Sequence, residues 1–261
     1  MKRNVRLTAG LIFIMAILSG CQSEKVASPA SVRVGASEIS DAARRLIYAR
    51  VWDLMERVAL FKPDAAGHEP MAVQLAPLLL QDARTGKKLS PHRVLYHTNS
   101  ITIAGKLVEQ RTFEWPNQSV RLTLDSSGHP AIWEVRHDSS GADIIWVSQR
   151  LEMAAGEQFG KALPGRSFSI ERSRSEAPWL VVPSVVDDGP VPMGPMAYLS
   201  ANGDVPLLTC RCSAFNAKTL EEGGIYELNR TDGKRRSSGP ETGDWWDPSR
   251  LEKRLRLPSS F

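Results

Sequence analysis

The sequence predicts an α+β fold in which an antiparallel sheet is covered on one face by an N-terminal helix and a shorter mid-chain helix. Two Asp-Ser-Ser-Gly segments, at 125–128 and 138–141, separate stretches of alternating apolar and polar residues. Residues 40–60 and 149–159 instead carry apolar residues at helical spacing. With 42% hydrophobic and 24% charged residues among 261, the composition is that of a globular protein, which excludes a disordered or collagen-like chain.

The first predicted helix spans roughly residues 40–60. Ser40 and Asp41 are suitable capping residues, and Pro63 would stop the helix. Its apolar residues, which include Leu46, Leu54 and Leu60, recur mostly every three or four positions. We interpret this stripe as a core contact and not as a membrane-lying face, because the opposite face is not rich in lysine.

A three-stranded antiparallel meander is predicted over residues 118–147, because the two turns are of the kind that join neighbouring strands. Trp133 and Trp146 fall in adjacent strands and could form a cross-strand pair, either in the core or as an aromatic binding platform. Before the meander, residues 101–115 indicate one long strand or a hairpin around Gly105. After it, residues 149–159 predict a helix that ends at Gly160.

We expect one globular domain over residues 38–229, although a break near 160–165 would also allow two. Residues 230–261 are polar and predict a partly disordered tail with a small terminal helix. Trp245 and Trp246 are the exceptions in this tail. They either dock back onto the domain or contact another protein or a membrane interface.

The N-terminus has the layout of a secretory signal. Lys2, Arg3 and Arg6 precede an unbroken apolar run at 11–18, and the small residues Ser19 and Gly20 follow it. The apolar run is well short of the roughly 20 residues that a membrane-spanning helix needs. We therefore assign residues 1–20 to a signal peptide.

The segment Leu18-Ser19-Gly20-Cys21 resembles the lipobox of bacterial lipoproteins. The resemblance covers only residues 1–21, and it implies cleavage before Cys21 and acylation of that cysteine. It also implies an anchor in the cell envelope. Gln22 and Ser23 favour the outer membrane, facing the periplasm, because retention at the inner membrane is favoured by an aspartate after the cysteine. Residues 21–37 are then expected to form a flexible tether.

The formal net charge of +4 largely reflects the signal peptide. Its removal takes away Lys2, Arg3 and Arg6 and no acidic residue, so 30 of the 33 basic residues remain beside all 29 acidic ones. The mature chain is thus near neutral, and we expect no nucleic acid among its partners.

Cys210 and Cys212, separated by one residue, are the clearest candidates for chemistry. They could form a strained disulfide, bind Cu(I) with the thioethers of Met193 and Met196, or include a reactive thiolate beside Arg211. They could equally be structural cysteines of the core. The five histidines do not have zinc-site spacing, and no nucleophile elbow or phosphate-binding loop is present.

These patterns predict a lipid-anchored envelope protein with no cofactor, which acts as a non-enzymatic binding or envelope-support module. Its expected partners are the membrane, through the lipid anchor, and another envelope protein. The alternative is a thiol-redox or soft-metal protein that uses Cys210 and Cys212. An enzyme whose catalytic residues are scattered along the sequence also stays open.

Overall fold

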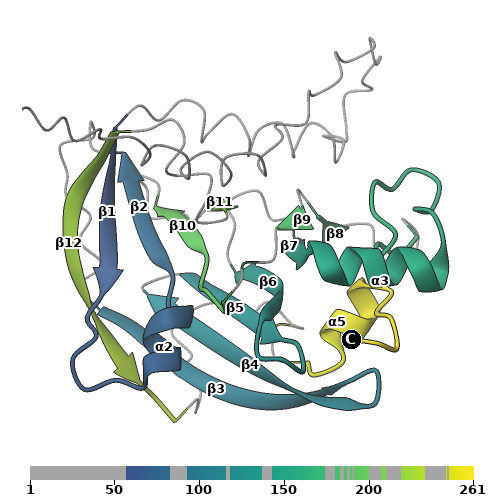
Figure 1. The fold of residues 1–261 in the computed structure, drawn as a ribbon, viewed down its shortest axis with the longest axis horizontal. Helices are drawn as coiled ribbons and strands as arrows, with labels where there is room; N and C mark the ends of the chain where they lie inside the picture. The colour runs from purple at the N-terminus through teal and green to yellow at the C-terminus, as the bar shows by residue number, and fades with distance from the viewer. Residues whose placement is uncertain are drawn as a thin grey trace, which may run out of the picture. The chain divides into compact units, whose positions relative to one another are not determined.

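The computed structural model describes twelve strands and three helices. The described residues are 57–82, 93–115, 118–136, 143–173, 180–182, 185–186, 189, 191–199, 207–209, 219–232, 245 and 247–261. All of them fall in one compact unit, Ile39–Phe261. The described strands belong to a single sheet with the order β11-β10-β2-β1-β12-β3-β4-β5-β6-β7-β8, and β9 also pairs with β7 (Figure 1). The predicted α+β class is confirmed.

Five consecutive strands form an antiparallel meander. They are β3 (Arg93–Ile103), β4 (Lys106–Trp115), β5 (Gln118–Leu124), β6 (Pro130–Arg136) and β7 (Asp143–Ser148). The meander predicted over 118–147 is therefore confirmed. Of the two alternatives for residues 101–115, one long strand or a hairpin, the structure has the hairpin. Both residues of the hairpin turn have positive φ, 50° at Ala104 and 77° at Gly105. That combination matches the right-handed twist of the two strands.

The rest of the sheet is assembled from segments far apart in the chain. These are β1 (Arg57–Pro63), β2 (Leu78–Asp82), β8 (Leu180–Val181), β9 (Val185–Val186), β10 (Met196–Leu199), β11 (Leu207–Thr209) and β12 (Thr219–Arg230). Strand β12 inserts between β1 and β3 and runs parallel to both. Parallel pairs also join β10 to β2, and β8 and β9 to β7. The sheet is thus mixed, and the prediction of an antiparallel sheet is wrong beyond the meander.

A two-glycine bulge allows β12 to pass from one half of the sheet to the other. The register with β1 shifts at this point, so that Leu60 faces Glu222 and Phe61 faces Gly224. A Cβ at Gly223 would lie 2.8 Å from the carbonyl oxygen of Leu60, and Gly224 has φ of 134°. Only glycine fits both positions, and such bulges increase the local twist of a strand. Figure 1 shows the sheet curling at β12.

The first predicted helix is wrong at its C-terminal end. Residues 57–60, which we predict as its last turn, belong to β1, and the rest of that helix lies outside the described residues. Val58 and Phe61 are buried, which fits helical spacing as well as a strand near a bulge. Pairing with β2 on one side and β12 on the other decides between the two, because it supplies hydrogen bonds on both edges of the backbone.

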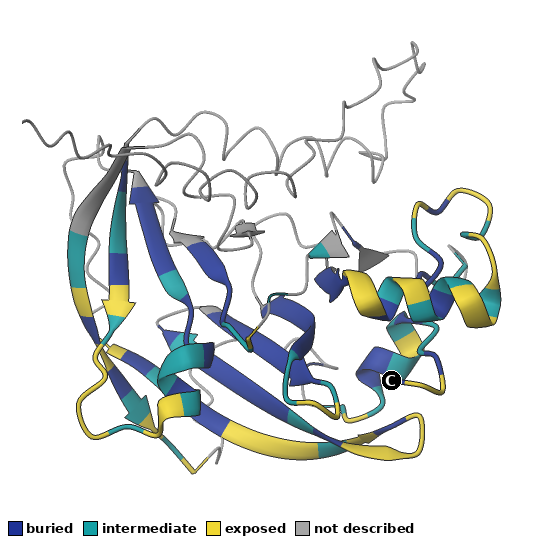
Figure 2. Cartoon of the chain, viewed as in Figure 1, coloured by how far each residue is buried: buried dark blue, intermediate teal, exposed yellow. Residues whose placement is uncertain are grey.

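The two faces of the sheet are covered by different helices (Figures 1 and 2). Helix α2 (Pro70–Leu75) packs with its Ala72 and Leu75 in a large inner cluster that includes the paired Trp133 and Trp146. Helices α3 (Gln149–Phe159) and α5 (Arg250–Arg254) pack in a second cluster, which contains Ile132, Ile145 and Val147 from the other face. The helix predicted over 149–159 is therefore confirmed.

Candidate functional site

The outer face of the meander, opposite the tryptophan pair, carries an unusual row of buried polar side chains. His97 lies opposite Thr112, Thr112 opposite Arg121, and Arg121 opposite Glu134 on four neighbouring strands. All four are at least 95% buried. We call these four residues the polar row. Side chains directly opposite each other on adjacent strands are close enough to interact, so the register alone brings this set together.

The strongest contact in the polar row is a bidentate ion pair between Arg121 and Glu134. Nε and Nη2 of Arg121 donate to the two carboxylate oxygens of Glu134 at 2.7 and 2.8 Å. Nε of Arg250, from α5, donates to the same carboxylate at 3.1 Å. Burial alone would raise the pKa of Glu134, but the charges and hydrogen bonds of Arg121 and Arg250 hold that pKa below its usual value. Glu134 is therefore ionised at neutral pH and held by two guanidinium groups, so it is poorly placed to act as a general base.

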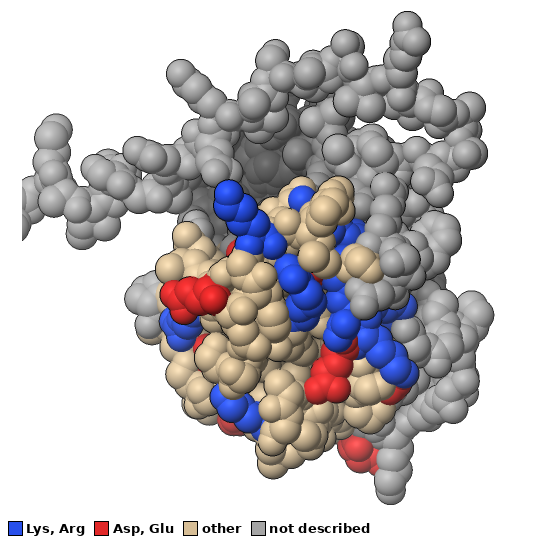
Figure 3. Space-filling model, turned by 90° about the vertical axis from the view of Figure 1, so that its right-hand side faces the viewer, with Lys and Arg blue, Asp and Glu red and all other residues tan. Residues whose placement is uncertain are grey.

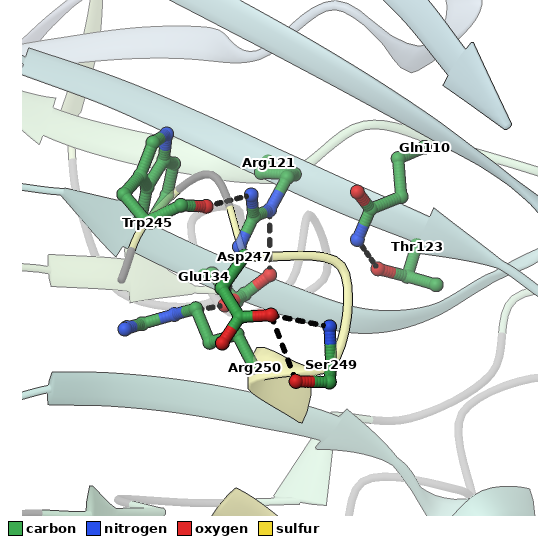
Figure 4. A network of polar contacts seen from close by, with 8 residues as sticks. All are labelled: Gln110, Arg121, Thr123, Glu134, Trp245, Asp247, Ser249 and Arg250. Carbon is green, nitrogen blue, oxygen red and sulfur yellow. Dashed lines mark hydrogen bonds and ion pairs between the residues drawn. The ribbon is translucent and has the colours of Figure 1, made fainter. Parts of the chain in front are cut away.

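Trp245 lies beside Arg121 of the polar row (Figure 4). Its carbonyl oxygen accepts a hydrogen bond from Nη1 of Arg121 at 2.7 Å, and the Arg121 guanidinium lies 4.1 Å from the centre of its ring. The guanidinium of Arg250 lies 5.6 Å from the same centre. Such cation–π contacts gain strength when they are shielded from water. Trp245 is 3% exposed, so of the two predicted alternatives it docks back onto the domain. Trp246 lies outside the described residues.

The segment after Trp245 is stabilised by contacts of Asp247 at the start of α5. The carboxylate of Asp247 accepts hydrogen bonds from the backbone N–H of Ser249 at 2.9 Å and from its hydroxyl at 2.8 Å. With the ammonium group of Lys253 as the largest cause, these contacts lower the pKa of Asp247 to about 2. Leu251, Leu255 and Phe261 are buried. Residues 247–261, which we predict as part of a polar tail, thus pack against the domain, and α5 matches the predicted small helix.

Arginines also tie the loop after α3 to this C-terminal segment. Nε of Arg172 donates to the carbonyl oxygens of Glu252 at 2.8 Å and Leu255 at 3.1 Å, and Arg256 donates to the carbonyl oxygen of Ser169. Figure 3 faces this side of the molecule and shows Lys and Arg gathered on it. Several of these guanidinium groups are occupied by backbone carbonyls, so the surface is less available to anions than its number of arginines indicates.

Buried polar groups lie in and beside the polar row. Burial is the main cause that lowers the pKa of His97; Glu114 opposes this effect and Arg121 adds to it, so the imidazole is neutral at pH 7. The hydroxyls of Thr112 and Ser119 and the indole N–H of Trp245 are buried and make no hydrogen bond in the described structure. Groups of this kind commonly bind ordered water.

The predicted soft-metal site is only partly visible. Met196 begins β10, where it is buried against Val58 and Leu80, and its register partner on β11 is Thr209. Met193 is half-buried ahead of Gly194. Cys210 and Cys212, like Cys21, lie outside the described residues. Among the residues that are described, His, Cys, Asp and Glu side chains do not form a group of three able to hold a metal ion.

The Arg121–Glu134–Arg250 network is not among the features predicted from the sequence. Arg121 alternates with the apolar residues of β5, which predicts an exposed side chain. One signal was present: the hairpin between β5 and β6 sets their register, and this register places opposite charges at 121 and 134 face to face. No local signal pointed to Arg250, because it reaches Glu134 from 116 residues away.

No protein-family model, curated protein or solved structure matches the chain. Within the described residues, none of the helices is long and apolar enough to cross a membrane.

Proposed function

We propose that the chain is a lipid-anchored protein of the bacterial cell envelope whose folded domain serves as a non-enzymatic binding module. The observation that carries this proposal is the segment Leu18-Ser19-Gly20-Cys21 behind a basic and apolar leader. Two or three acyl chains on Cys21 would hold the domain at a bilayer surface, since each buried methylene contributes roughly 0.8 kcal/mol. Gln22 and Ser23 favour the outer membrane.

The chemistry of the polar row favours a structural role for Glu134 over a catalytic one. Glu134, its single carboxylate, is engaged on both oxygens by Arg121 and Arg250. Acid–base catalysis usually requires a group whose pKa lies near the working pH and which can reach a substrate proton. The lowered pKa and deep burial of Glu134 fit a structural connection, which holds the C-terminal segment on the sheet.

Metabolic labelling with an alkyne fatty acid, followed by membrane fractionation, tests the anchor. The wild-type chain should be labelled and sediment with membranes, whereas Cys21→Ala should lose both properties. Cys210→Ala is the matched control, because it removes a different cysteine and should keep the label. Labelling and membrane association that persist in Cys21→Ala would show that the lipobox interpretation is wrong.

The alternative function is a thiol or soft-metal site built on Cys210 and Cys212. One observation favours it: β11 ends at Thr209, immediately before Cys210 in sequence, and Thr209 lies opposite Met196. Thiolates and thioethers together select Cu(I). Titration of the thiols with and without reductant, and Cu(I) binding measured before and after Met193→Leu, test this role. Two unreactive thiols and no bound copper would exclude it.

A further inference from the structure

The outer edge of β3 is longer than the strand that covers it. Strand β12 pairs only with Arg93–Tyr96 of β3, and the pairing ends at Arg230. Strand β3 continues to Ile103, so that its last seven residues have β4 on one side and none of the described strands on the other. Thr98, Asn99, Ser100 and Thr102 are exposed, and Figure 2 shows exposed residues along β3. None of the described segments therefore pairs with this stretch of strand edge.

The backbone groups that point outward along this edge follow from the hairpin. A two-residue turn makes its flanking residues, Ile103 and Lys106, a hydrogen-bonded pair. Counting back from Ile103, the backbone N–H and C=O groups of every second residue of β3 then bond to β4. The backbone groups of the residues between them, Thr98, Ser100 and Thr102, point away from β4. Tyr96, two residues before Thr98, fits this alternation, because its carbonyl accepts a hydrogen bond from the N–H of Thr231 at 2.7 Å and so points away from β4.

Both ends of the open edge are held in place. At one end Thr231 bonds to Tyr96. At the other, Ile103 is fully buried in the cluster with α5, and the N–H of Ala104 donates to a carboxylate oxygen of Glu252 at 2.7 Å. A preformed edge of this kind loses little conformational entropy when it binds a partner.

The edge also lacks the features that usually protect exposed strands. Residues 98–103 include neither a charged residue nor a proline, and the register between β3 and β4 shows no bulge. Natural proteins commonly block exposed edges with such features, because unpaired N–H and C=O groups readily accept another strand.

From these observations we infer that Thr98–Thr102 of β3 binds a short, extended, uncharged segment of a partner protein as an added strand. The inference rests on the proposed binding role and identifies its surface, but it does not depend on the lipid anchor. The open stretch of five residues is about 17 Å long and offers the N–H and C=O groups of three residues. Threonine and other β-branched residues suit the partner strand, because they pair well with the exposed threonines.

A second copy of the chain fits this edge less well than a short segment. Two copies paired antiparallel about Ser100 would place Ala104 of one chain opposite Tyr96 of the other. That position is already taken by Thr231, which bonds to the Tyr96 carbonyl. A free segment can stop before this point and extend past the hairpin tip in the other direction.

Selection of a displayed random heptapeptide library on the full chain, purified in detergent micelles, tests this inference. Ser100→Pro removes an outward N–H without breaking the pairing to β4, and Ser100→Ala is the matched control that keeps this N–H. Selected peptides should bind wild type and Ser100→Ala with affinities within about twofold, and Ser100→Pro at least about tenfold more weakly. They should also slow amide hydrogen exchange at Thr98, Ser100 and Thr102 of the wild type.

Failure to select a binding peptide would overturn the inference, as would protection at another surface or equal binding to a folded Ser100→Pro variant. The exchange measurement uses wild-type protein, so it decides the question even if the proline variant does not fold. Sedimentation that shows a dimer formed through these same amides would replace the partner segment by a second copy. None of these outcomes involves Cys21, whose test is membrane fractionation, so the anchor and the strand edge can fail separately.

Discussion

Replacing Glu134 by glutamine should be among the most destabilising single changes in the described structure. Glu134 is 1% exposed and lies between the side chains of Arg121 and Arg250, which are 6% and 5% exposed. The substitution keeps the size of the side chain but leaves two buried guanidinium groups without their common counter-charge. Removal of one partner of a buried ion pair costs about 3–5 kcal/mol, and we expect Glu134→Gln to lower the free energy of unfolding by that amount.

Urea unfolding followed by tryptophan fluorescence measures this loss. If the free energy of unfolding falls by about 2–3 kcal/mol per molar urea, the urea concentration at the unfolding midpoint should fall by roughly 1–2 M. Glu157→Gln is the control, since Glu157 is exposed on α3 and its substitution should change the stability by less than about 0.5 kcal/mol.

The pH dependence of the same variant gives a second readout. Because the pKa of Glu134 is lowered in the folded state, its contribution is complete above the ordinary carboxyl value of 4.5 and is lost as the pH falls through the lower folded value. The difference in stability between wild type and Glu134→Gln should therefore shrink as the pH is lowered below 4.5.

A loss smaller than about 1 kcal/mol at neutral pH would refute this reasoning, because it would mean that water already solvates the arginines. The combined replacement of Arg121 and Arg250 by methionine and of Glu134 by leucine separates the lost charge balance from lost packing. Apolar replacement of an entire buried ionic group is often neutral or stabilising, so this variant should recover most of the stability of the wild type.

Two further predictions concern α2 and α5. Gly194→Ala would place a Cβ 2.1 Å from the carbonyl oxygen of Leu75, so it should lower the free energy of unfolding by more than the ~1–3 kcal/mol that overpacking usually costs, which a thermal melt would show as a lower midpoint. Gly156→Ala is its control, because the nearest atom would be 3.7 Å away and the change should stabilise α3 by about 0.5–1 kcal/mol. Asp247, with a pKa of about 2, should support α5 fully above pH 4 and less as the pH falls toward 2. The protection of α5 amides, measured as their exchange rate relative to that of an unfolded chain at the same pH, should therefore fall over this range in the wild type but not in Asp247→Asn. Equal acid sensitivity of the two would count against the role of Asp247.

The elements that were predicted correctly depend on short-range patterns. The turn at 125–128 and the alternation on either side of it determine which residues of β5 and β6 meet, because a hairpin sets its own register. The same reasoning explains the Trp133–Trp146 pair and the end of α3 at Gly160. In each case all the residues involved are close in sequence, so their pattern carries the information.

The predictions that failed concern segments whose partners are distant. Val58 pairs with Leu220, and nothing in the sequence around Val58 indicates a strand that arrives 162 residues later. The burial of Arg121 has the same origin, because Trp245 packs against it from the far end of the chain. The open edge of β3 likewise depends on a distant segment, because among the described strands only β12 pairs with that edge and its register ends at Arg230.

By itself the sequence determined the meander, the helix at 149–159 and the expectation of a lipid anchor at Cys21, since each is encoded in a contiguous segment. Tertiary structure alone decided that the sheet is mixed, that the polar row is buried and that none of the described strands pairs with the outer edge of β3 beyond Tyr96. The physical reason is that backbone hydrogen bonding and desolvation depend on what packs against a residue. For β1, β3 and Glu134, those neighbours come from more than 100 residues away.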